Sequence, residues 1–127
     1  MESKESFIEI LNKLNGFKIV FKELHWLTKN NSAHLLFDTV YDAIHEFQDN
    51  FAEEGFTIYG LPEKNSIFTI QIYDEESQNL EGLKSFLMEI KSEISLVNID
   101  GSFDGMIKLC NGFLHSINKF IYLSKQD

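Results

Sequence analysis

Hydrophobic residues recur at steps of three and four along four stretches of this chain, which is the period of a helix that buries one face. The stretches cover about residues 6–28, 32–54, 80–96 and 103–123. Their main apolar positions are, in chain order, Phe7, Ile10, Leu11, Leu14, Phe17, Phe21, Leu24, Leu36, Phe37, Val40, Ile44, Phe47, Phe51, Leu83, Phe86, Leu87, Ile90, Ile94, Met106, Ile107, Cys110, Phe113, Leu114, Ile117, Phe120 and Ile121. Because each stripe needs another apolar face to pack against, the pattern predicts an all-α fold of four helices.

Polar and glycine-containing segments separate these helices. In "KNNS", Ser32 is a good N-cap for the second helix, and Gly55 is a plausible end for it. The segment 55–78 contains the only proline, Pro62, and the alternating run "IFTIQIY", which suits a short extended stretch. Helices joined by short, long and short links predict a ferritin-like four-helix bundle with a long connection between helices 2 and 3. We expect residues 1–127 to form a single ferritin-like domain.

Composition and charge limit the function. No apolar run approaches the roughly 18 residues of a membrane span, and "MESKESF" does not resemble a signal peptide, so we expect a cytoplasmic protein without membrane contact. The only cysteine, Cys110, fits a reducing compartment and a place in the core. The net charge of -9 and the lack of a basic tail argue against DNA binding and favour the attraction of cations.

The polar side of the second helix carries a row of metal-ligand residue types. At about 100° per residue, Asp38, His45, Asp49 and Glu53 all fall within about 100° of His34. Such a row also fits a solvated helix face.

His25 favours a metal site over a merely solvated helix face. It lies at the edge of the first helix's apolar face, where a histidine needs a partner, and a short turn brings it towards His34 and Asp38. Imidazole and carboxylate ligands together suit iron, with manganese or zinc as alternative occupants of the same site.

Spacing along the second helix predicts where the rest of the site comes from. Asp38 and Asp49 are 11 residues apart, about 16 Å along a helix, which is too far for both to bind one small metal ion. If two copies pack with these helices antiparallel about a two-fold axis, Asp49 and Glu53 of one copy come level with His34 and Asp38 of the other. Two equivalent sites then form between the chains.

The same stretch, "LHWLTKNNSAHLLFDTVYDAIHEFQDNFAEE", resembles the Dps-type mini-ferritins. In their motif, His-Trp ends the first helix, a His and an Asp follow at a spacing of four, and a later Asp precedes an Ala-Glu pair. The matching positions here are His25, Trp26, His34, Asp38, Asp49, Ala52 and Glu53. The closing stretch "INKFIYLSKQ" is also similar to the family's last helix, so the likeness spans most of the chain and is weakest over residues 55–78.

The resemblance implies a ferroxidase, an oxidoreductase that acts on metal ions. Such a protein binds Fe(II) at the interface of a homodimer, oxidises it preferably with hydrogen peroxide, and stores ferric iron in a homo-oligomeric shell, usually a dodecamer, which protects against oxidative damage. His25, His34, Asp38, Asp49 and Glu53 would be both metal ligands and catalytic residues.

Trp26 and the turn between the two histidines each allow two interpretations. Trp26 would be an oxidisable ring beside the site or an anchor for the helix end. The family usually has a longer turn between the two histidines, which favours the alternative of a ferritin-like oligomeric protein with a structural or binding role and weak or no ferroxidase activity.

Overall fold

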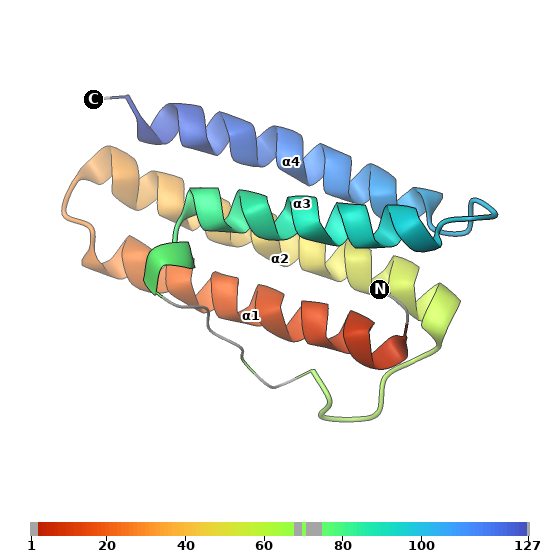
Figure 1. Ribbon diagram of the computed structural model, residues 1–127. Coiled ribbons are helices and arrows are strands. Elements are labelled where there is room, and N and C mark those ends of the chain that lie inside the picture. The colour runs from red at the N-terminus through yellow and green to blue at the C-terminus, as the bar shows by residue number, and fades with distance from the viewer. Residues whose placement is uncertain (1–2, 68–69, 71–74, 127) are drawn as a thin grey trace.

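Four α-helices and one short 3-10 helix form the described part of the chain, which comprises residues 3–67, 70 and 75–126 of a computed structural model. The elements are α1 (Lys4–Leu27), α2 (Asn31–Tyr59), η1 (Glu75–Ser77), α3 (Leu80–Val97) and α4 (Asp104–Ser124). No β-strand occurs among these residues. The helices lie side by side, as expected for a four-helix bundle (Figure 1). The prediction of an all-helical chain with four helices is confirmed.

The pairing of the helices brings His25 and His34, two of the predicted site residues, to one end of the molecule. α1 packs against α2, α3 packs against α4, and α2 also packs against α4. The turn between α1 and α2 spans only residues 28–30. It lies at the same end of the bundle as the last turn of α4 (Figure 1). His25 and His34 flank this turn.

The second helix begins earlier than the sequence suggested. Asn30, and not Ser32, is the N-cap residue, and its side-chain oxygen accepts a hydrogen bond from the backbone N–H of Ala33 at 3.1 Å. Asn and Ser are nearly equal as N-cap residues, so residue type alone does not distinguish the two start positions. With this earlier start, His34 is the fourth residue of α2 and lies in its first turn.

The predicted helix end at Gly55 is wrong. Gly55 is buried inside α2, which continues to Tyr59 and ends at Gly60, whose φ of 85° favours glycine. A Cβ at Gly55 would lie 2.0 Å from the ring of Phe7. The missing side chain therefore allows α1 and α2 to approach closely, and it does not mark a helix stop.

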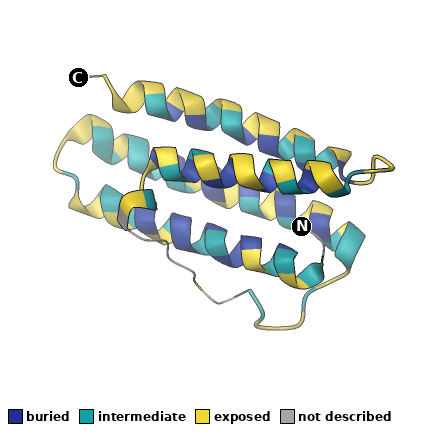
Figure 2. Cartoon of the chain, viewed as in Figure 1, coloured by how far each residue is buried: buried dark blue, intermediate teal, exposed yellow. Residues whose placement is uncertain are grey.

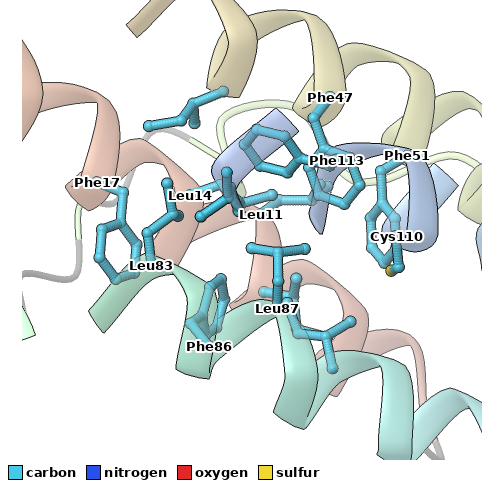
Figure 3. Packing of buried hydrophobic residues seen from close by; sticks show 14 of the residues in the cluster. Leu11, Leu14, Phe17, Phe47, Phe51, Leu83, Phe86, Leu87, Cys110 and Phe113 are labelled. Carbon is cyan, nitrogen blue, oxygen red and sulfur yellow. The ribbon is translucent and has the colours of Figure 1, made fainter. Parts of the chain in front are cut away.

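The buried faces of the four helices meet in one core, and buried and exposed residues alternate along each helix with the period of a turn (Figure 2). Aromatic rings link the helices. Phe47 of α2 stacks on Phe113 of α4 with 4.6 Å between ring centroids, and Phe7 lies 5.7 Å from Phe51. Cys110 lies among these side chains (Figure 3), which confirms its predicted place in the core. Full burial of such side chains contributes about 1.5–3 kcal/mol each, so this core holds the helices in register.

Part of the segment after α2 lies along α1. The carbonyl oxygens of Ser66 and Ile67 accept hydrogen bonds from the side-chain amides of Asn12, at 3.4 Å, and Asn15, at 2.7 Å. Asn12 is buried, so its amide needs such a partner. The predicted extended run "IFTIQIY" begins at Ile67 and otherwise lies, apart from Ile70, outside the described residues.

Candidate metal-binding site

His25 and His34 form a reciprocal pair across the turn between α1 and α2. The Nδ1 atom of His25 lies 2.7 Å from the carbonyl oxygen of His34, and Nδ1 of His34 lies 2.6 Å from the carbonyl oxygen of His25. The two imidazole rings are stacked, with 3.8 Å between their centroids and an interplanar angle of 26°. Despite the short turn, the structure therefore brings the two predicted histidine ligands into direct contact.

This hydrogen bonding fixes where the ring protons are. A carbonyl oxygen only accepts hydrogen bonds, so Nδ1 must be the donor on both rings. In a neutral imidazole the other nitrogen, Nε2, then carries the lone pair. Histidine ligands in metal sites are commonly oriented in this way, with one ring nitrogen donating to a backbone carbonyl and the other free for the metal. Both rings are thus held as potential Nε2 ligands.

The third predicted ligand on this side of the site, Asp38, already has a cation beside it. The Lys22 ammonium of α1 lies 3.2 Å from the Asp38 carboxylate and 4.5 Å from the centre of the Tyr41 ring. Asp38 does not join the two histidines in a single cluster, because the described residues contain no group of three or more His, Cys, Asp or Glu side chains arranged to hold a metal ion.

A second lysine of α1 reaches the same row of α2 residues one helical turn away. Lys18 donates a hydrogen bond from Nζ to Oε1 of Gln48 at 2.6 Å, and its Nζ lies 3.5 Å from Nδ1 of His45. Gln48 in turn donates to the side-chain oxygen of Asn15 at 2.7 Å. Partial burial lowers the pKa of the Lys18 ammonium, because removal from water disfavours the charged form.

The remaining two predicted ligands lie further along α2. Asp49 and Glu53 are both exposed, and neither carboxylate forms an ion pair with another described residue. Asp49 is about 16 Å along the helix from Asp38. Within one chain, then, the structure joins His25 with His34 and leaves Asp49 and Glu53 on open surface.

Other residues singled out in the sequence have simpler positions. Trp26 is 70% exposed, so it does not anchor the end of α1 within the chain, and that interpretation is wrong. Leu27, the next residue in α1, and Leu35, near the start of α2, are also exposed. His115 is exposed on α4.

The sequence pattern did not draw attention to Lys18 and Lys22, the two lysines of α1 that contact the polar side of α2. A signal for them was present, because Lys18, Lys22 and His25 follow one another at steps of four and three and so share one face of α1. A search for metal-ligand residue types passes over lysine, because an ammonium group is not a metal ligand.

Comparisons of this chain with protein-family models, curated proteins and solved structures found no match. None of the helices in the described residues is long and apolar enough to cross a membrane.

Proposed function

We propose that this chain is a Dps-like iron-binding protein of ferritin-like fold that oxidises Fe(II), preferably with hydrogen peroxide, and stores ferric iron in an oligomeric shell. The observation that carries the proposal is the His25–His34 pair, whose mutual Nδ1–H hydrogen bonds leave both Nε2 atoms available as ligands.

The site is completed by a second copy of the chain. Asp49 and Glu53 are exposed and without ion-pair partners among the described residues, and they lie on the same helix as His34. An antiparallel, two-fold packing of two α2 helices moves these carboxylates of one copy next to the histidines of the other. The exposed Trp26, Leu27 and Leu35 offer apolar surface at the same end for such an interface.

The residues suit the redox chemistry as well as the binding. Carboxylate oxygens favour Fe(III) over Fe(II), so Asp38, Asp49 and Glu53 assist oxidation, while the two imidazoles set the position of the metal. Two Fe(II) ions each lose one electron, the O–O bond of one hydrogen peroxide breaks, and two protons are taken up to form two water molecules. The net charge of -9 draws Fe(II) to the protein. Manganese or zinc would occupy the same ligands without this reaction.

Anaerobic titration with Fe(II), followed by peroxide and by measurement of ferric absorbance, tests the proposal, with size exclusion on the same sample. We expect iron binding, rapid ferric formation and an oligomer. His25→Ala and Asp49→Ala should each abolish most of the oxidation, and His115→Ala, which removes an exposed histidine elsewhere, should leave it unchanged. A strictly monomeric protein, or unchanged oxidation in the first two variants, would show the proposal to be wrong.

The second candidate function is a ferritin-like oligomer with a structural or binding role and without fast iron oxidation. The ion pair between Lys22 and Asp38 favours it, because that carboxylate is already neutralised inside the chain. In this case the Fe(II) titration gives an oligomer of the same size with slow oxidation that none of the site variants changes.

A further inference from the structure

Lys22 places a cation against one oxygen of the Asp38 carboxylate. Its ammonium lies 3.2 Å from Oδ1 of Asp38, within ion-pair distance, and the two side chains are only partly exposed, at 33% and 43%. An ammonium on Oδ1 takes up lone pairs of that oxygen and repels a divalent ion that approaches either oxygen of the carboxylate. Metal binding by Asp38 is therefore weakened for as long as Lys22 stays in place.

The structure also offers a place for the displaced ammonium. Lys22 already lies over the ring of Tyr41, 4.5 Å from its centre, and the face of an aromatic ring attracts a cation. Tyr41 comes one turn after Asp38 on the same side of α2. A short movement of the flexible lysine stem keeps one favourable contact while the carboxylate is released.

We propose that Lys22 is an internal competitor for the metal site: it holds Asp38 in the metal-free chain and is displaced when a divalent ion binds. This inference rests on the proposed function, since it assumes that Asp38 is a metal ligand. Its consequence is a raised threshold for metal binding. The protein would remain empty at low free Fe(II) and load only when the metal is abundant enough to displace the lysine.

Two variants that each remove one positive charge distinguish competition at Asp38 from a general electrostatic effect. Lys22→Gln removes the competing ammonium, whereas Lys13→Gln removes an ammonium that pairs with Glu9 at 3.4 Å elsewhere on α1. Zn(II) serves as the probe, because it does not undergo redox chemistry, and calorimetry of the assembled protein gives its Kd. We expect Lys22→Gln to bind Zn(II) about three- to tenfold more tightly than the unaltered chain, which corresponds to the free energy of one ion pair near the surface. Lys13→Gln and the charge-conserving Lys22→Arg should bind like the unaltered chain.

A second measurement uses the unaltered protein, so its result does not depend on whether a variant folds. In NMR spectra of the unaltered protein, the Cε–H signal of Lys22 should shift as Zn(II) is added, while that of Lys13 should not. Unchanged or weaker Zn(II) binding by Lys22→Gln, or a Lys22 signal that does not respond to bound zinc, overturns the inference.

Different results would disprove the proposed metal site itself. If the unaltered chain binds no Zn(II), or if it binds Zn(II) with an affinity that His25→Ala does not change, the metal site itself is absent. If His25→Ala weakens binding and Lys22→Gln has no effect, the site exists and only the competition is wrong.

Discussion

His25 and His34 hold the turn between α1 and α2 closed by each donating an Nδ1–H to the other's carbonyl oxygen while their rings stack at 3.8 Å. The two carbonyls belong to the last turn of α1 and the first turn of α2. The hydrogen-bond ladder of α2 begins at the Asn30 carbonyl, which accepts from the backbone N–H of His34 at 2.9 Å, and the His25 carbonyl is one of the groups that a helix end leaves without an intrahelical partner. The pair therefore stabilises the turn as well as orienting two possible ligands.

This dual role predicts a coupled loss of stability. His25→Ala and His34→Ala should each lower the free energy of unfolding by about 1–2 kcal/mol, since each removes one hydrogen bond and the ring stacking. The double variant should cost less than the sum by at least about 0.5 kcal/mol, because the stacking is lost only once. Urea unfolding measures all three. The exposed His115→Ala is the control and should change stability by less than about 0.5 kcal/mol; strictly additive losses would contradict the reciprocal pair.

Two glycines in helix interiors should respond to alanine with opposite sign. At Gly55 a Cβ would overlap the ring of Phe7, so Gly55→Ala should destabilise the protein by about 1–3 kcal/mol. At Gly112 a Cβ meets no atom within 4 Å, so Gly112→Ala should stabilise it by about 0.5–1 kcal/mol through helix propensity. Thermal unfolding of the two variants checks both signs. Similar effects at both positions would mean that α1 and α2 do not approach closely at Gly55.

A site shared between chains predicts that two inactive variants restore activity when mixed. His25→Ala/His34→Ala and Asp49→Ala/Glu53→Ala should each fail to oxidise Fe(II). A mixed dimer of the two contains one site that lacks every ligand from these pairs and one site that keeps them all. After joint refolding, ferric formation should therefore recover to a fraction of the unaltered rate. If each chain carried a complete site, mixing would restore nothing.

The single tryptophan reports on the proposed interface. Trp26 is 70% exposed in the isolated chain, so it should fluoresce at long wavelength and be quenched readily by acrylamide when the protein is dilute. On assembly, burial of this apolar end should shift the emission to shorter wavelength and slow the quenching. Emission followed across a concentration series, alongside size exclusion, measures both. A tryptophan that stays equally accessible in the oligomer would place the interface elsewhere.

Cys110 should make the protein less stable in strongly alkaline solution. Burial raises the pKa of its thiol from 9.0 to about 12. The thiol is neutral in both states below pH 9, where its contribution is complete, and that contribution is lost as the pH rises from about 9 towards 12 because only the unfolded chain ionises. The loss approaches about 1.4 kcal/mol per pH unit. Unfolding curves for the unaltered chain and Cys110→Ala should therefore converge over this range; parallel curves would show that the thiol ionises equally in both states.

The helices and their buried faces were predictable from the sequence because both depend on local periodicity. Phe7, Leu14, Ile44 and Ile94 fall on the apolar stripe of their helices, and all four are fully buried in the bundle. A helix needs an apolar face of this period whatever it packs against, so the pattern alone predicts which side faces inwards. His25 and His34 were likewise marked by residue type and by a turn too short to separate them.

Tertiary structure decided what the pattern left open, because the relevant contacts depend on how the helices are aligned. Glycine is a residue type that often ends a helix. Only the position of Phe7 on the neighbouring helix shows why Gly55 continues α2. Asp38 has the spacing of a ligand, yet its ion pair depends on where the long, flexible side chain of Lys22 crosses from α1. Sequence periodicity assigns a residue to a face of its own helix, and the packing of two helices determines which side chain it meets there.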